Sequence, residues 1–162
     1  HPPILIGGGK PRVLRLAGRE ADIAGILTTS VGSGVVVDDP AERTVAAVCE
    51  KIGWIREGAG ERFDGIELSL IPTVRFTDDR EGEAQRMIAE RGWQGITVAD
   101  VLEMPSVFIG SVDEIVAQMR ERRERYGFSY YVVSDSMMEA FAPVVERLAA
   151  GVGELAVQAL IP

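Results

Sequence analysis

Hydrophobic positions along this chain form short continuous apolar runs that alternate with longer stretches of helical period. The runs at 4–6, 21–27, 66–71 and 130–133 have the length and composition of strands buried in a sheet. Between them, apolar residues recur every three or four positions, as they do on the buried face of a helix. The pattern therefore predicts four units, each made of a strand and a helix.

Capping residues and prolines in first turns mark where the helices begin. The predicted helices cover 12–20, 40 to about 55, 79–91, 98–102, 111–126 and 137–150. Ser111 with Glu114 three residues later forms a capping box. The charge run at 120–125 lies on the other side of that helix, and we interpret it as a solvated, ion-paired face.

Strands joined by helical crossovers predict a parallel α/β sheet. Four units are too few to close a (β/α)8 barrel of the TIM type, which needs eight strands and roughly 250 residues. The sheet is therefore either open, with helices on both faces, or half of a barrel. Because the sequence lacks an initiator Met and enters a strand by its third residue, we expect a fragment of a longer polypeptide and favour the half barrel.

Composition and charge exclude several classes of protein. The chain has 162 residues, 46% of them apolar, which fits one soluble domain. Its 25 acidic and 17 basic side chains give a net charge of -8, so nucleic acid and anionic membranes are poor partners. No apolar run approaches the roughly 20 residues of a membrane span, and no export signal opens the chain, so we expect a cytoplasmic protein.

Cysteine and histidine are too scarce to build a metal or histidine-based catalytic site. Cys49 is the only cysteine, which excludes an internal disulfide and a thiolate metal cluster, and it falls on a helical stripe where we interpret it as a small core residue. The only histidine is His1. We also find no nucleophile–base pair and no metal-ligand spacing.

The glycine triplet after the first strand is the clearest candidate site. Gly7, Gly8 and Gly9 join a predicted strand to a predicted helix. Glycines there let backbone N–H groups approach a phosphate, and the helix N-terminus and Lys10 add attraction. The alternative is a tight turn that needs glycine for its backbone alone.

Two hydroxyls follow the second strand, at the same predicted edge of the sheet. Thr28 and Thr29 would offer a second contact to a phosphate, because the carboxyl ends of parallel strands carry the ligand in α/β folds. Their alternative role is to satisfy loop amides. The sequence thus predicts a place to hold an anion without the groups that would transform it.

Two segments resemble a known family. The segment 2–22, PPILIGGGKPRVLRLAGREAD, resembles the strand–Gly-Gly–helix–Ala-Asp segment of the bacterial luciferase-like monooxygenases, especially the branch that uses the deazaflavin coenzyme F-420. FIGSVDEI at 108–115 and YGFSYYVVS at 126–134 are similar to that family's last crossover helix and eighth strand. The two motifs occur in the family's order and together span most of the chain.

The resemblance implies that residues 1–162 form a single domain, the carboxyl-terminal half of a TIM barrel with strands five to eight, in which 93–105 belong to an insertion before the last strand. It implies that the coenzyme phosphate is held by Gly8, Gly9 and Thr28 or Thr29. The family often has a basic side chain after the sixth strand, whereas Ser30-Val31-Gly32 follows here. The groups that handle substrate and protons would lie in the amino-terminal half.

The implied activity is hydride transfer between coenzyme F-420, or FMN as the alternative, and a small organic substrate. The implied partners are a second copy of the chain or the missing amino-terminal half, and we expect the fragment alone to be inactive. Two rival functions remain. One is a barrel enzyme of another reaction class that binds a phosphate at the same loop, and the other is a non-catalytic half barrel that self-associates as a scaffold.

Overall fold

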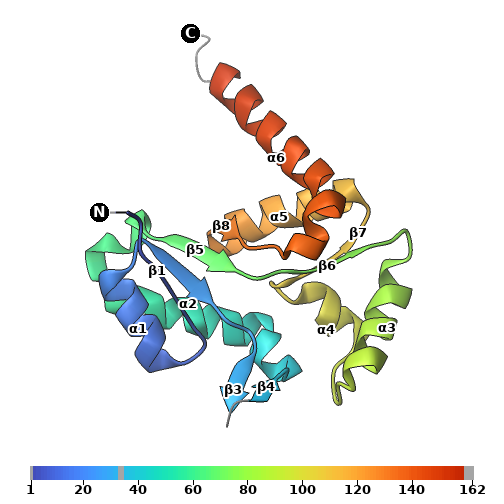
Figure 1. Cartoon of the computed structure of the whole chain (residues 1–162), viewed down its shortest axis with the longest axis horizontal. Helices are drawn as coiled ribbons and strands as arrows, with labels where there is room; N and C mark the ends of the chain where they lie inside the picture. Colours follow the sequence, from blue (N-terminus) through green and yellow to red (C-terminus); the bar gives the residue numbers. More distant parts are fainter. Residues whose placement is uncertain (1, 33–34, 159–162) are drawn as a thin grey trace.

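The centre of the molecule is a four-stranded parallel sheet (Figure 1), in a computed structural model that describes residues 2–32 and 35–158. Its strand order is β1-β2-β5-β8, and every neighbouring pair is parallel. The strands are β1 (Leu5–Gly8), β2 (Ile23–Ile26), β5 (Glu67–Leu70) and β8 (Phe128–Tyr131). All four predicted strands are confirmed, although the last one begins two residues earlier than predicted.

Helices cover one face of this sheet and build the main core with it. The larger helices are α1 (Pro11–Glu20), α2 (Val45–Ala59), α5 (Val112–Tyr126) and α6 (Met138–Gln158). Side chains from the sheet and from all four helices share one buried cluster. In Figure 1 the far part of α6 extends away from the rest of the chain. None of the helices within the described ranges is long and apolar enough to cross a membrane.

Between β5 and α5 the chain makes an excursion with its own small core. Two further strands, β6 (Thr73–Phe76) and β7 (Val107–Gly110), pair in parallel. β7 packs with α3 (Arg80–Arg91) and α4 (Val98–Glu103) around a second buried cluster, whereas Val74 of β6 belongs to the main core. The predicted helix at 98–102 is confirmed, and β7 is a strand that the sequence pattern did not predict.

Capping side chains begin the helices much as predicted. Ser111 accepts from the Glu114 amide at 3.4 Å and Glu114 accepts from the Ser111 amide at 2.8 Å, which confirms the capping box. The predicted helix from residue 40 is interrupted. Asp39 begins a short 3-10 helix, η1 (Pro40–Arg43), and Thr44 then caps α2. Two further 3-10 helices are η2 (Gly60–Gly65) and η3 (Asp135–Met137).

A short antiparallel hairpin follows β2. Its strands are β3 (Ser30–Gly32) and β4 (Val35–Val37). The sequence predicts a glycine-rich loop at 32–34, of which residues 33 and 34 lie outside the described residues.

The two faces of the main sheet differ in burial. Register and alternation put Ile6, Leu68 and Phe128 on the outer face, which α1, α2 and α5 cover. On the opposite face, which we call the inner face, Leu5 is 48% exposed and Tyr130 is 41% exposed. The continuous apolar run at 4–6 predicts a strand buried on both faces. This prediction is wrong, because helices cover only one face.

Two residue-level predictions also need correction. Cys49 is exposed rather than part of the core, because it lies at the edge of the buried stripe of α2, beside a gap between α2 and α5. Arg122, within the predicted solvated charge run, is only 3% exposed. It is buried because α5 packs near α4, where Arg122 Nη2 donates to the Leu102 carbonyl at 3.4 Å.

Candidate anion site at the carboxyl ends of the strands

The carboxyl ends of β1 and β2 lie side by side and bring the predicted site residues together. The Leu27 amide donates to the Gly8 carbonyl at 2.9 Å. A Cβ added to Gly9 would lie 3.0 Å from the Leu27 carbonyl and 3.6 Å from that of Thr29. The glycine triplet and the two threonines therefore meet at one edge of the sheet, as the sequence predicts.

The three glycines are needed for different reasons. A Cβ on Gly8 would lie 2.6 Å from Val13 Cγ1, so Gly8 lets α1 pack against β1. Gly9 lets the loop pass close to the end of β2. A Cβ on Gly7 would meet only the Gly25 carbonyl, at 3.7 Å, on the inner face. Close packing thus accounts for Gly8 and Gly9, and neither has the positive φ that a left-handed turn would require.

The N-terminus of α1 is open to an anion. Lys10 occupies its N-cap position without a side-chain hydrogen bond to the helix, Pro11 begins it, and its first turn contains no acidic residue. The positive end of a helix dipole without such a carboxylate attracts negative charge from elsewhere. The Lys10 ammonium, 62% exposed, bonds the Glu42 carboxylate at 2.7 Å, which raises the pKa of Lys10.

A buried arginine reaches the predicted Thr28 hydroxyl. Arg43 comes from η1, and its side chain is 6% exposed. Its Nη1 donates to Thr28 Oγ1 at 3.2 Å and to Ser106 Oγ at 3.4 Å, and its Nε donates to Asp38 Oδ1 at 2.6 Å. Burial lowers the pKa of Arg43, and Asp38 acts in the opposite direction. Thr28 Oγ1 is thus the acceptor in its hydrogen bond with Arg43.

Asp38 is shared with a second arginine. Arg91, at the end of α3, bonds Asp38 Oδ2 at 2.5 Å. The Trp93 ring packs against both guanidinium groups, with centroid distances of 5.0 Å to Arg91 and 5.7 Å to Arg43, and its indole N–H donates to the Asp38 carbonyl at 3.0 Å. One carboxylate thus serves two arginines.

A second carboxylate, that of Glu42, is likewise shared by two cations, Lys10 and the buried Lys51. Lys51 of α2 is 2% exposed, and its ammonium bonds the Leu27 carbonyl at 3.1 Å and the Glu42 carboxylate at 2.7 Å. Hydrogen bonds from Lys10 and then from Lys51 lower the pKa of Glu42. The edge of the sheet therefore gathers four cations, Lys10, Arg43, Lys51 and Arg91, around the two carboxylates that bond them, Asp38 and Glu42, with Asp39 close enough to act on Lys10.

Sequence reasoning missed the three cations that lie deeper. Lys51 carried a signal, since it falls on the apolar stripe of α2 between Val48 and Ile52, where a buried charge needs partners. Arg43 and Arg91 had no such signal in the sequence, because they meet at Asp38, which is remote from Arg91 along the chain. No cluster of metal-ligating side chains occurs within residues 2–32 and 35–158.

Comparison with solved structures identifies the fold. Long-chain alkane monooxygenase (LadA) matches 92% of this chain and 41% of its own, with a TM-score of 0.55 and 14% identity. Coenzyme F420-dependent tetrahydromethanopterin reductase from Methanopyrus kandleri matches 82% and 45%, with a TM-score of 0.50 and 18% identity. An F420-dependent secondary alcohol dehydrogenase, solved with an F420-acetone adduct, matches 88% and 48%, with a TM-score of 0.50 and 16% identity.

This chain spans less than half the length of each of these proteins. Its fold is α/β and corresponds to half of their TIM-type barrel, which confirms the predicted half barrel. No protein-family model matches the sequence, and no curated protein matches it.

Proposed function

We propose that this chain supplies the phosphate-binding part of a coenzyme site in an oxidoreductase of the luciferase-like type. The observation that carries the proposal is the group of four cations and two carboxylates around Thr28, beside the open N-terminus of α1. Carboxyl ends of parallel strands are where barrels of this architecture hold phosphate groups. The fold shared with two F420-dependent enzymes supports a deazaflavin, and the fold shared with a monooxygenase keeps FMN as the alternative.

The residues present fit the phosphate tail of such a coenzyme. Backbone N–H groups of Gly9 and the first turn of α1, with the Lys10 ammonium, would hold it from one side, and the hydroxyls of Thr28 and Thr29 from the other. Gly7 and Gly8 would contribute through the backbone of the turn that leads to Gly9, where Gly8 also lets α1 pack against β1. When bound, the coenzyme ring would exchange a hydride with a small organic substrate.

The proposal assigns residues 1–162 to a single domain, the carboxyl-terminal half of such a barrel. The groups that handle substrate and protons would then come from elsewhere, since we see no nucleophile–base pair among the described strand ends. The contribution of this chain is to bind and orient the coenzyme. A sugar-phosphate enzyme would use the same anion site, and the experiment below separates the two possibilities.

The test compares coenzymes with and without their phosphate. The full chain is titrated with F-420 and with its deazaflavin chromophore lacking the phosphate tail, and in parallel with FMN and riboflavin, while ring fluorescence is followed. We expect each phosphate-bearing molecule to bind at least about tenfold more tightly than its counterpart. Equal binding of both members of each pair, or no saturable binding up to millimolar coenzyme, would rule the site out.

Variants of exposed residues then locate the contact. Lys10→Gln removes an exposed cation and leaves the core unchanged. We expect it to weaken the binding of F-420 about tenfold and to leave the affinity for the chromophore without the phosphate tail unchanged. Arg19→Gln, which changes an exposed arginine at the other end of α1, is the matched control. Gly8 is unsuitable for this purpose, because any larger residue would clash with Val13. Competition by a sugar phosphate but not by F-420 would favour the rival enzyme class.

A further inference from the structure

A pocket lies on the outer side of the sheet, away from the candidate coenzyme site. It has a volume of about 530 Å³ and is bounded by α2, η2 and the end of α5. Ile66 and Gly127, which line it, directly precede β5 and β8. The pocket is thus at the amino ends of the strands, whereas the anion site is at their carboxyl ends.

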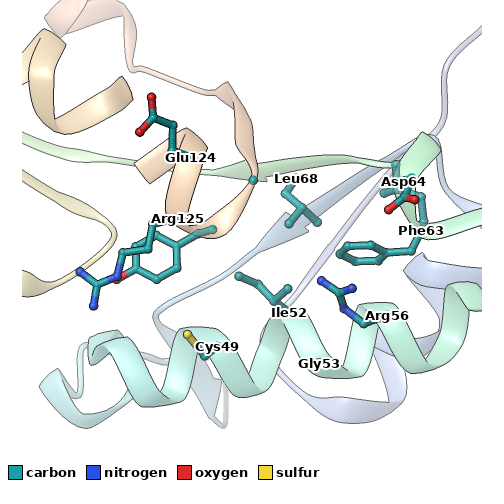
Figure 2. Close-up of a pocket in the computed structure, with 12 residues that line it drawn as sticks. Cys49, Ile52, Gly53, Arg56, Phe63, Asp64, Leu68, Glu124 and Arg125 are labelled. Carbon is teal, nitrogen blue, oxygen red and sulfur yellow. The ribbon is translucent and has the colours of Figure 1, made fainter. Parts of the chain in front are cut away.

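The pocket exists because two neighbouring crossover helices do not pack together. α1 and α2 are in close contact, since Gly18 and Gly58 allow their backbones to approach. Within the described part of the chain, α2 and α5 have no comparable contact. Figure 2 shows the gap, with Ile52 of α2 and Leu68 of β5 forming an apolar middle.

The two ends of the pocket differ in chemistry. At one end the Arg56 guanidinium lies 4.1 Å from the centroid of the Phe63 ring. The Arg56 guanidinium has no hydrogen bond or ion pair to another residue within the described ranges, so its donors remain free for a ligand. Tyr126, only 8% exposed, lines the other end together with Arg125. The Arg125 guanidinium lies 5.2 Å from the centroid of the Tyr126 ring and pairs with Glu103 and Glu121.

Two acidic side chains, Asp64 and Glu124, are also part of the lining. In Figure 2 Glu124 points away from the apolar middle, whereas Arg56 lies directly beside it. Of the two arginines in the lining, Arg125 is paired with acidic residues of its own surroundings, so Arg56 is the cation left to meet a ligand beside the apolar middle. A ligand that covers Ile52 and Leu68 would bring its polar end to Arg56.

We infer that this pocket binds a small molecule with an elongated apolar body and a single carboxylate. The carboxylate pairs with Arg56, and the body covers Ile52, Leu68 and Phe63 as far as Tyr126. The volume lies within the range of about 300 to 1,000 Å³ that small-molecule sites occupy. A bidentate pair between a guanidinium and a carboxylate gives such a site its specificity for acids.

Gly53 provides a variant that fills the pocket without disturbing the fold. It lies on α2 and lines the pocket, and a Cβ added there would meet no heavy atom within 4 Å. A phenylalanine at this position would occupy the ligand's volume, and it replaces a residue that is unfavourable inside a helix. Thermal unfolding verifies that Gly53→Phe is folded.

The experiment uses decanoate as the probe, with decanol and decylammonium as neutral and cationic analogues, in calorimetric titrations of the full chain below micellar concentrations. We expect saturable binding of one decanoate per chain, with decanol at least about tenfold weaker. Arg56→Gln should reduce decanoate affinity about tenfold, Gly53→Phe should abolish binding, and the control Arg19→Gln should change nothing.

Several results would overturn the inference. These are the absence of saturable decanoate binding, equal binding of decanoate by the wild type and Gly53→Phe, or tighter binding of decylammonium than of decanoate. A second copy of the chain in the groove is a further possibility. It would appear as a dimer that Gly53→Phe converts to a monomer, with no decanoate bound, and would also overturn the inference.

Discussion

Single carboxylates at the candidate site each balance two cations. Asp38 bridges Arg43 and Arg91, and Glu42 bridges Lys10 and Lys51. Such sharing leaves the group of Asp38, Arg43 and Arg91 with one positive charge in excess, which would favour an anion in a chain whose net charge is negative. Removing either carboxylate would leave a buried cation without its partner, which is costly for stability.

Glu42 predicts a specific dependence of stability on pH. Its pKa in the folded chain is lowered from its ordinary value of 4.5 by hydrogen bonds from Lys10 and Lys51. A carboxyl group whose pKa is lowered by folding stabilises the folded chain at every pH above its ordinary pKa. This contribution to the free energy of unfolding is lost as the pH falls through the lowered pKa. We expect Glu42→Gln to reduce the free energy of unfolding by roughly 1.5 kcal/mol at pH 7, and the difference from the wild type to shrink as the pH falls below about 4.5.

Urea unfolding at a series of pH values measures this difference. Glu57→Gln is the control, because the exposed pair of Glu57 with Arg15 is expected to contribute less than about 1 kcal/mol. A constant difference between the wild type and Glu42→Gln from pH 7 to pH 3 would contradict the prediction.

At the scale of elements, the contact between α1 and α2 rests on glycines that look alike in the sequence. A Cβ on Gly58 would lie 2.1 Å from the Arg15 carbonyl, whereas one on Gly53, in the same helix, would meet open space. We expect Gly58→Ala to lower the free energy of unfolding by about 2 kcal/mol and Gly53→Ala to raise it by roughly 0.5 to 1 kcal/mol. Urea unfolding of the two variants tests this, and a shift of both in the same direction would refute it.

Local signals in the sequence predict the elements, and contacts remote in sequence explain where prediction fails. The helix that starts near Asp79 and the capping box at Ser111 depend on neighbouring residues, so pattern alone finds them. The strand predicted at 66–71 ends at Leu70, and the next strand, β6, leaves the main sheet to pair with β7. A four-residue strand whose only partner is non-local leaves no periodic signal.

The candidate site also combines residues that local sequence signals predict with residues that only remote contacts bring together. Gly9 and Thr28 can be placed together from the sequence, because carboxyl ends of adjacent parallel strands share one edge of a sheet. Arg43 and Arg91 join them through η1 and α3, which lie far apart along the chain. Their convergence on Asp38 needs the tertiary structure, and so does the difference between the packing roles of Gly8 and Gly9.

At the scale of the whole molecule, the half barrel leaves an apolar surface uncovered. On the inner face Leu5 is 48% and Tyr130 41% exposed, and Ile71 and Val132, which continue the alternation one residue past β5 and β8, are 58% and 41% exposed. β1 and β8 are the edges of the sheet, and unpaired parallel edges favour association with another chain. Because two copies together have the eight strands of a closed barrel, we expect the chain to self-associate through this face.

Sedimentation velocity over a range of concentrations measures this association. Glutamates at two inner-face positions, Leu5→Glu with Val132→Glu, should shift the chain to a monomer, because burying a carboxylate in an apolar interface is unfavourable. Val145→Glu places the same charge on an apolar residue of α6 that is 53% exposed, and it should leave the association unchanged. A wild type that is monomeric at every concentration, or an equal effect of Val145→Glu, would show that the inner face does not drive assembly.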